Sequence, residues 1–258
     1  THMQRLATLP DTPARSTVVV AGGGFTGSET ACEMPARLRE ILGADCQPRV
    51  IIIDRGQSVG ASMGTAIAPV IAEATAELGV ELCLSSSVVA VDEHGVTLAD
   101  GQRIDAATVV WTAGVRASEL TAQVPAERDP LGRLHVDANL RVIGSPNVFA
   151  TGDSAFAACD ELGNHALMTC QHAIALGRSA GNNAAAQLLD VAPVPYRQSK
   201  YVTCLDLGAW GAVFTEGWDR QVKLVRQEGK ALKTQINTQW IYPPIADRDV
   251  ALAAADPL

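Results

Sequence analysis

A short apolar run followed by a glycine-rich turn is the feature that most constrains how this 258-residue chain folds. Residues Thr17–Ala21 (TVVVA) are small or β-branched, which favours a buried parallel strand. The turn Gly22–Gly27 comes next, and Thr26–Leu42 then carries apolar side chains at helical spacing, with Pro35 expected to kink or break the helix. Because a second apolar run, Arg49–Asp54 (RVIIID), follows, the order predicts a βαβ unit.

The turn has the glycine spacing of a dinucleotide site. Gly22, Gly24 and Gly27 form a G-x-G-x-x-G pattern between a strand and a helix, which is the context that this motif requires. Gly22 permits the tight turn, Gly24 lets the backbone approach a pyrophosphate, and Gly27 lets the helix pack on the strand. The phosphates would then lie at the helix N-terminus, where N–H groups and the helix dipole favour anions. The pattern therefore predicts a Rossmann-type nucleotide-binding domain.

Charged residues around this turn bear on the choice of cofactor. Asp54 would accept hydrogen bonds from the adenosine ribose and repel a 2′-phosphate, which favours NADH over NADPH. Arg55 is either a solvated surface charge or a group that softens this preference. Glu29 either pairs with the helix dipole or points toward the nicotinamide. The predicted NADH-binding residues are Gly22, Gly23, Gly24, Phe25, Thr26, Gly27, Glu29, Asp54 and Arg55.

The rest of the first hundred residues fits one α/β domain. Ile67–Leu78 has a helical stripe closed by Gly79. Short strands with a hairpin signal at Asp100-Gly101 follow from Val80, and Thr108–Trp111 (TVVW) reads as a buried strand. Residues 15–114 are therefore expected to form a βαβ unit with an added β-meander.

A second candidate site lies in residues 115–190. Asn147–Thr151 is predicted to be a strand that delivers Gly152 and Asp153 at its carboxyl end, where ligands bind on open parallel sheets. Leu134–Val136 and Leu140–Val142 also have the composition of short strands. The long Ala-rich helix Thr169–Leu189 begins with Gln171, His172 and Ala173, and its N-terminus would stabilise negative charge on a ligand. A cap or surface position is the alternative interpretation of His172.

The last part of the chain is predicted to be a small α+β region. Pro193 and Pro195 mark a boundary. Strands are expected within Tyr201–Phe214 and over Gln221–Val225, and a short helix over Thr234–Tyr242.

The order of these motifs resembles the flavin-dependent pyridine nucleotide oxidoreductases, in particular the type II NADH dehydrogenase-like branch. The segments that carry the resemblance are GGGFTGSE, VIIID, DAATVVWTAGV, VFATGDSA and QHAIALGRSAGNNAA. The resemblance implies FAD and NAD as cofactors. It implies that Ala113 and Gly114 contact nucleotide through their backbone, that Gly152 and Asp153 bind the flavin ribityl and phosphate groups, and that Gln171, His172 and Ala173 lie against the isoalloxazine.

The resemblance also suggests how the chain is divided. We expect a connecting segment at 1–14, the NADH-binding Rossmann-type domain at 15–114, the second half of a FAD-binding domain at 115–190, and a C-terminal α+β region at 191–258. The family begins with its own flavin-binding βαβ unit, which has no counterpart before the fingerprint at residue 22. The acidic, Ala-rich C-terminus does not match the basic amphipathic helices of membrane-attached members.

The composition of the chain limits the classes of partner that it is expected to bind. The net charge of −8 and the aromatic content of 4% argue against nucleic acid and anionic lipid, and no apolar run is long enough for a membrane span. The six cysteines fit no zinc pattern or C-x-x-C pair, so no metal is expected. Without a signal peptide at Thr1–Pro10, a cytoplasmic location is expected.

Together these features predict an enzyme that passes hydride from NADH to FAD and electrons to an acceptor that the sequence does not identify. One alternative is a nucleotide-binding fragment that is inactive because half of the FAD site is missing. Another is an NAD(P)H-dependent ferredoxin, peroxide or disulfide reductase. A homodimer is one of the expected oligomeric states.

Overall fold

The computed structural model describes residues 1–257, which group into two compact units. The first unit contains Thr1–Gly114 together with Val202–Asn237, and the second contains Val115–Tyr201 together with the residues from Thr238 onward. The division at Gly114 coincides with the boundary expected from the sequence. The grouping of 202–237 with the first unit differs from the separate C-terminal region expected from residue 191.

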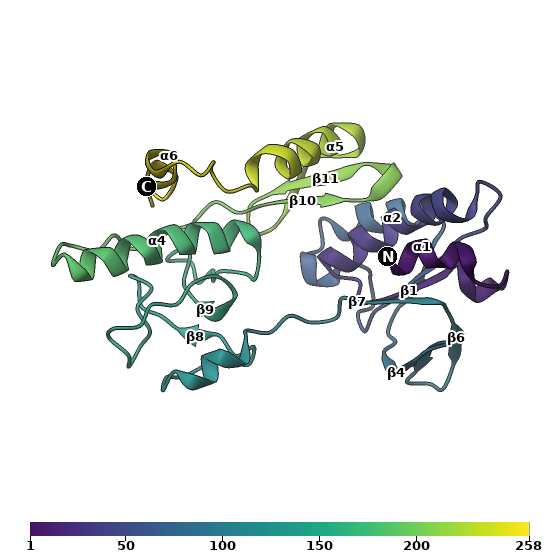
Figure 1. The fold of residues 1–258 in the computed structure, drawn as a ribbon, viewed down its shortest axis with the longest axis horizontal. Helices are drawn as coiled ribbons and strands as arrows, with labels where there is room; N and C mark the ends of the chain where they lie inside the picture. Colours follow the sequence, from purple (N-terminus) through teal and green to yellow (C-terminus); the bar gives the residue numbers. More distant parts are fainter. Residues whose placement is uncertain (258) are drawn as a thin grey trace. The chain divides into compact units, whose positions relative to one another are not determined.

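A parallel four-stranded sheet forms the centre of the first unit (Figure 1). The strand order is β3-β2-β1-β7, and the register places Ala21 beside Ile53 on one side and beside Trp111 on the other. Since all four strands are parallel, their carboxyl ends meet at one edge of the sheet. The strands are β1 (Thr17–Ala21), β2 (Arg49–Ile53), β3 (Val80–Cys83) and β7 (Thr108–Trp111).

Alternating side chains of β1 pack into two different hydrophobic cores. Val18 and Val20 pack with the helices α2 (Phe25–Leu42) and α3 (Ala68–Leu78), while Val19 packs with the antiparallel meander. All three valines are fully buried, as expected for a parallel strand that is covered on both faces. The meander consists of β4 (Val88–Asp92), β5 (Gly95–Leu98) and β6 (Arg103–Asp105).

Two details of the helices can be compared with the sequence. A kink or a break was expected at Pro35; helix α2 continues through it, so the break is wrong. Gly79 ends α3 in the left-handed conformation with φ +71°, which confirms the predicted C-cap. Ahead of the sheet, α1 (His2–Arg5) leads to Leu6, which is fully buried in the same core.

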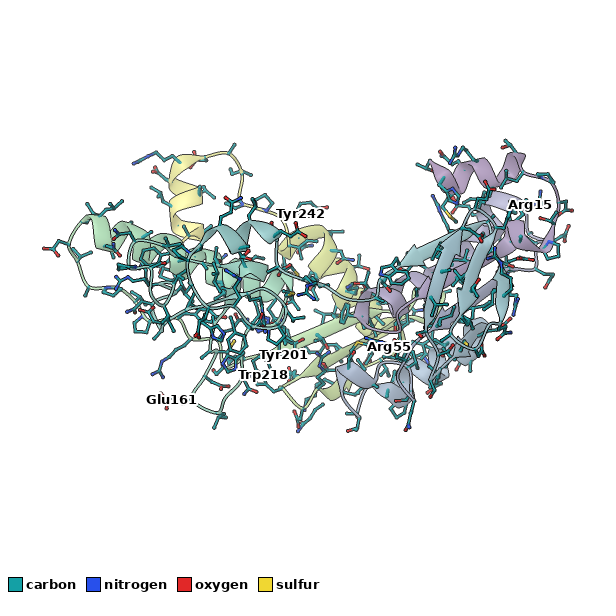
Figure 2. The ribbon with its side chains drawn as sticks, turned by 90° about the horizontal axis from the view of Figure 1, so that it is seen from below. Arg15, Arg55, Glu161, Tyr201, Trp218 and Tyr242 are labelled. Carbon is teal, nitrogen blue, oxygen red and sulfur yellow. The ribbon has the colours of Figure 1, made fainter. Side chains whose placement is uncertain are left out.

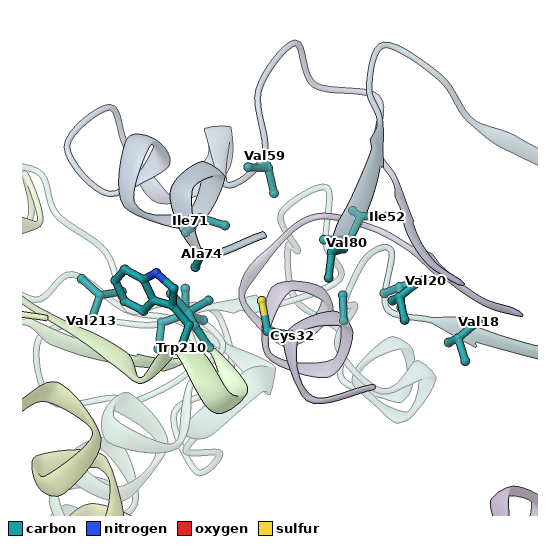
Figure 3. Packing of buried hydrophobic residues seen from close by; sticks show 14 of the residues in the cluster. Val18, Val20, Cys32, Ile52, Val59, Ile71, Ala74, Val80, Trp210 and Val213 are labelled. Carbon is teal, nitrogen blue, oxygen red and sulfur yellow. The ribbon is translucent and has the colours of Figure 1, made fainter. Parts of the chain in front are cut away.

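Residues 202–237 belong to the first unit because their apolar side chains enter its core. Trp210 and Val213 lie in the same cluster as Ile71 and Ala74 of α3 (Figure 3). A Cβ on Gly208 would overlap the backbone of Cys32 in α2, so glycine allows this close approach. The elements are β10 (Val202–Asp206), β11 (Ala212–Glu216), β12 (Gln221–Leu224) and α5 (Arg226–Gln235).

Helix α5 begins at Arg226, whereas a helix was expected to begin only at Thr234. Its segment RQEGKALKTQ has few apolar residues, so periodicity gives a weak signal. Tertiary contacts hold its start: the Arg226 guanidinium lies 4.1 Å from the Trp210 ring and pairs with Glu73 and Glu77 of α3. Between Gln235 and Tyr242 the backbone forms a π-helical turn, Ile236–Trp240.

The second unit has little regular strand structure. Its strands β8 (Leu134–His135) and β9 (Ala155–Phe156) pair in parallel. Its helices are α4 (Cys170–Leu188), which agrees with the predicted helix, and α6 (Arg248–Ala254). Among residues 1–257, no helix combines the length and apolar character needed to cross a membrane.

The predicted strands at Asn147–Thr151 and Leu140–Val142 are wrong. Arg141 and Phe149 form only an isolated bridge. On either side of it the Val142 N–H donates to the Val148 carbonyl and the Ala150 N–H donates to the Leu140 carbonyl, and the two runs are joined by a turn that contains Ser145. These short apolar runs pair with each other across that turn instead of extending a sheet.

Candidate functional site

A cavity of about 940 Å³ lies in the first unit at the carboxyl edge of the parallel sheet. The cavity is lined by the first three glycines of the turn after β1, by Asp54 and Arg55 after β2, and by residues 111–114, which begin with the last residue of β7. Ligands of open α/β sheets bind at this edge, so the cavity has the position of a nucleotide site. The structure thereby brings together most of the residues that the sequence assigned to NADH.

The glycines of the turn have the geometry that a close backbone approach requires. Gly22 has φ +113°, a conformation that other residues rarely adopt. A Cβ on Gly27 would overlap the carbonyl oxygen of Gly22, so only glycine lets the first turn of α2 lie against the end of β1. A Cβ on Gly24 would meet no atom within 4 Å, because this residue faces the open cavity.

Asp54 ties the end of β2 to the glycine turn. Its Oδ2 accepts a hydrogen bond from the Gly23 N–H at 2.6 Å, and its Oδ1 accepts one from the Gly56 N–H at 2.7 Å. A carboxylate has about four lone-pair positions, so both oxygens retain capacity for ribose hydroxyls. Asp54 therefore positions the turn in addition to its predicted ribose contact.

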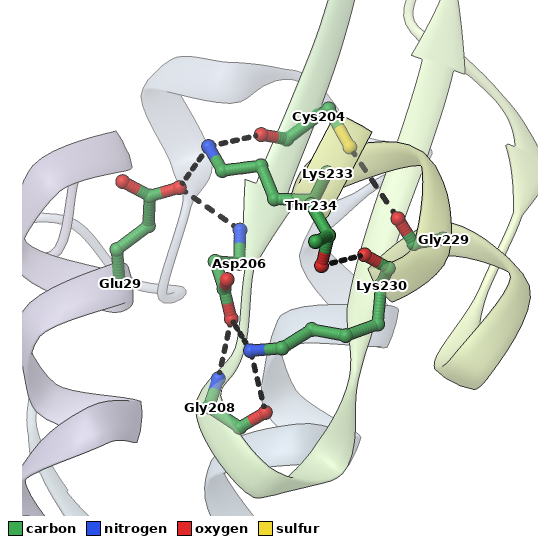
Figure 4. A network of polar contacts seen from close by, with 8 residues as sticks. All are labelled: Glu29, Cys204, Asp206, Gly208, Gly229, Lys230, Lys233 and Thr234. Atoms are coloured by element: carbon green, nitrogen blue, oxygen red, sulfur yellow. Dashed lines mark hydrogen bonds and ion pairs between the residues drawn. The ribbon is translucent and has the colours of Figure 1, made fainter. Parts of the chain in front are cut away.

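Glu29 takes part in contacts that neither interpretation of the sequence included. Its Oε1 accepts hydrogen bonds from the backbone N–H of Asp206 at 2.9 Å and from Lys233 Nζ at 2.8 Å (Figure 4). Lys233 Nζ also donates to the Cys204 carbonyl and lies 5.6 Å from the Phe25 ring. Glu29 thus joins the start of α2 to β10 and α5, within the first unit.

Of the other predicted residues, Phe25, Thr26 and Gly27 form the first turn of α2 and are not among the residues that line the cavity. Thr26 is exposed on the first turn of α2. Arg55, which is labelled in Figure 2, is exposed. It is one of the residues that line the cavity. Trp111, which was not predicted as a site residue, also lines the cavity. The sequence feature that could have identified Trp111 as a site residue is its place as an aromatic residue at the carboxyl end of a predicted parallel strand.

The second unit brings together the residues that the resemblance assigned to flavin. Gly152 begins a short 3₁₀ turn with φ +59°, and a Cβ added to it would lie 3.6 Å from the Ala173 Cβ. The turn therefore contacts the first turn of α4, which carries Gln171 and His172. Asp153 is exposed beside this helix N-terminus.

His172 is buried, so its alternative interpretation as a surface residue is wrong. Its side chain is fully inaccessible, and the Thr169 hydroxyl lies 2.8 Å from its Nδ1. Thr169 is the helix cap, since its Oγ1 accepts the His172 N–H. Burial lowers the pKa of His172 to about 4, so the imidazole is neutral at pH 7.

We expect His172 to make folding stability depend on pH. In the unfolded chain it takes up a proton as the pH falls below about 6.5, whereas its folded pKa is about 4. The unfolded state therefore binds more protons between these values, and stability falls as the pH falls through this window. Urea unfolding of His172→Gln between about pH 7 and 5 should show a shallower decline than that of the wild type.

The exposed His94 supplies the matched control. His94→Gln is expected to keep the wild-type slope. An unchanged slope in His172→Gln would show that burial of this imidazole does not set the pH dependence.

Comparison with known proteins shows which family the chain is similar to. The sequence model of the pyridine nucleotide-disulphide oxidoreductase family matches residues 2–177. An NADH dehydrogenase-like protein of Mycobacterium tuberculosis is 50% identical over 260 residues, which cover 99% of this chain and 64% of that protein. A type II NADH:quinone oxidoreductase of the same organism is 38% identical over 54% of this chain and 33% of its own length. The chain thus spans about two thirds of the length of the mycobacterial relative that it matches throughout.

Solved structures share the fold at low sequence identity. A NAD-dependent persulfide reductase from A. fulgidus matches 84% of this chain and 37% of its own chain, with a TM-score of 0.62 and 20% identity. A ferredoxin reductase from Rhodopseudomonas palustris matches 82% of this chain and 48% of its own chain, with a TM-score of 0.63 and 21% identity. These matches confirm the predicted α/β fold class.

Proposed function

Because the chain belongs to the pyridine nucleotide-disulphide oxidoreductase family, we propose that the protein containing it oxidises NADH with the help of FAD. Family membership implies FAD and NAD(H) as cofactors. The observation that carries the proposal for this chain is the cavity built by the glycine turn, Asp54 and Ala113-Gly114. When bound, FAD would supply the hydride acceptor, and the protein would supply binding, orientation and electrostatics.

The first unit holds the dinucleotide. The pyrophosphate approaches the open face of Gly24 and the N-terminus of α2. Asp54 accepts the ribose hydroxyls with the lone pairs that Gly23 and Gly56 leave available. Ala113 and Gly114 line the far side of the cavity, where their backbone is exposed.

The second unit supplies part of the flavin site. The positive φ of Gly152 and its contact with Ala173 leave a side-chain-free surface next to the start of α4. Asp153 would bind the ribityl and phosphate end of the cofactor, as the family resemblance implies. Gln171 and the neutral His172 would lie at the end of the helix that favours negative charge on a reduced ring. The side chain of His172 is fully inaccessible, so it would support the start of α4 from within the unit instead of lying against the isoalloxazine as the resemblance implies.

The electron acceptor of the reaction is a separate question from the oxidation of NADH. Relatives whose names include a quinone, such as the M. tuberculosis type II NADH:quinone oxidoreductase, make a quinone the first acceptor to test. Cytoplasmic location and a homodimer stay predictions from the sequence.

Exchange of Asp54 tests both NADH binding and cofactor choice. Asp54→Asn removes the charge and turns an NH₂ group toward one of the two backbone N–H donors, so it disturbs the glycine turn. We expect NADH to bind about 10-fold more weakly, at a cost of about 1.4 kcal/mol. The preference for NADH over NADPH should shrink, because repulsion of the 2′-phosphate is lost. Calorimetric titration with NADH and NADPH measures both effects.

Asp45→Asn is the matched control, because Asp45 is exposed ahead of β2 and lies outside the cavity. It makes the same change in net charge and is expected to leave both affinities unchanged. If the wild-type chain bound NADPH as tightly as NADH, the assignment of Asp54 would be wrong. If it bound neither, the proposed function would fail for this chain.

A further inference from the structure

Trp111 is a large aromatic residue whose side chain is exposed in the cavity. It is 58% exposed although it ends a strand whose first residue, Thr108, is buried. Its Nε1–H donates a hydrogen bond to the Ala113 carbonyl at 3.1 Å. This bond satisfies the polar atom of the indole and fixes the orientation of the ring, so the aromatic faces are the part left for a ligand.

The register of the sheet places Trp111 relative to the rest of the site. Ala21 pairs with Ile53 on one side and with Trp111 on the other. Neighbouring strands lie about 4.8 Å apart, so Trp111 is about 10 Å across the edge from Ile53. Asp54 follows Ile53, and the glycine turn follows Ala21. The ribose site, the pyrophosphate site and Trp111 therefore follow one another along the edge.

This order determines which half of a dinucleotide reaches Trp111. The adenosine ribose lies at Asp54 and the pyrophosphate at the glycine turn, so the chain of the ligand continues toward β7. The remaining half is the nicotinamide riboside. We propose that the indole of Trp111 stacks on the nicotinamide ring of NAD(H), an inference that rests on the proposed function.

The chemistry of the ring supports this pairing. Aromatic rings prefer offset or edge-to-face contact, and the oxidised nicotinamide carries a positive charge that the face of an indole attracts. NAD⁺ is therefore the suitable probe, and it gives a binding readout without turnover. ADP-ribose is its matched partner, because it keeps the adenosine and pyrophosphate but lacks the nicotinamide.

Calorimetric titration of Trp111→Ala and Trp111→Phe with these two ligands tests the proposal. In Trp111→Ala, NAD⁺ should bind about 5- to 10-fold more weakly, whereas the affinity for ADP-ribose should stay within about 2-fold. In Trp111→Phe, which keeps a smaller ring but loses the N–H, the loss for NAD⁺ should be smaller than in Trp111→Ala. Trp240→Ala is the control, because Trp240 is also 58% exposed but belongs to the second unit; both affinities should stay at the wild-type values.

Three results would overturn the stacking. The first is an unchanged NAD⁺ affinity in Trp111→Ala. The second is an equal loss for NAD⁺ and ADP-ribose, which would place the indole on the shared half of the ligand or show a general change of the cavity. The third is a Phe variant as weak as the Ala variant, which would assign the effect to the bond with Ala113. If the wild-type chain bound neither ligand, the proposed function would fail and the stacking with it.

Discussion

Replacing Gly27 with alanine is expected to destabilise the first unit by about 3 kcal/mol and to abolish dinucleotide binding. The added Cβ would overlap the carbonyl oxygen of Gly22, which is backbone and has no rotamer by which to move away. The start of α2 must then shift from the end of β1, and the glycine turn loses the shape that approaches a pyrophosphate. Urea unfolding and titration with ADP-ribose measure the two effects.

Gly24→Ala separates binding from folding in the same turn. Gly24 has φ −76°, and its added Cβ would meet no protein atom within 4 Å. The stability should therefore stay within about 0.5 kcal/mol of the wild type, while the Cβ enters the space of the pyrophosphate and lowers affinity. Full ADP-ribose affinity in Gly24→Ala would show that the ligand does not pass over this face. Wild-type stability in Gly27→Ala would show that the helix does not need the close approach.

The glycine turn could be predicted from the sequence because its determinants are local. The strand Thr17–Ala21, the turn and the start of α2 lie within a few residues of one another, and each has its own pattern. Asp54 was also predicted, since an acid at the end of the second strand belongs to the same motif. Its bond to the Gly23 N–H adds a structural role that the pattern alone does not specify.

The contacts of Glu29 could not be predicted, because they depend on residues far away in the chain. Lys233 is separated from Glu29 by 204 positions, and no spacing rule covers such a pair. Residues 202–237 also depend on contacts with distant parts of the chain. Their strands were expected from the sequence, but their packing into the core of the first unit was not. Their membership depends on side chains such as Trp210, which pack into a cluster formed mainly by earlier parts of the chain.

The second unit was predicted less well, because turns held by aspartate side chains replace much of its strand structure. The Asp129 Oδ1 accepts hydrogen bonds from the backbone N–H groups of Leu131 and Arg133, and the Asp137 Oδ1 accepts them from Asn139 and Arg141. Such bonds satisfy backbone groups without a sheet ladder. The two turns differ in one respect: the Arg133 guanidinium also pairs with the Asp129 Oδ2 at 2.7 Å, with side-chain exposures of 11% and 7%.

Asp129→Asn is expected to cost about 3 kcal/mol of stability at pH 7, because it leaves the buried Arg133 charge without its carboxylate. Asp137→Asn keeps the Oδ1 acceptor of the same kind of turn and breaks no ion pair, so it should cost less than about 1 kcal/mol. The difference between the two variants in urea unfolding isolates the ion pair. Equal losses would show that the turn, and not the charge pair, carries the stability.

The ion pair between Asp129 and Arg133 should also affect how folding stability falls at acidic pH. Burial opposes ionisation of Asp129, but hydrogen bonds from the Arg133 backbone and guanidinium outweigh it and hold the pKa below its usual value. The folded state therefore keeps the carboxylate charged after the unfolded chain has begun to take up a proton. The stabilisation is complete above the unfolded pKa of about 3.9 and is lost as the pH falls through the lower folded pKa. Because Asp129→Asn has no proton to bind at this position, its stability should decline less steeply below about pH 4 than that of the wild type.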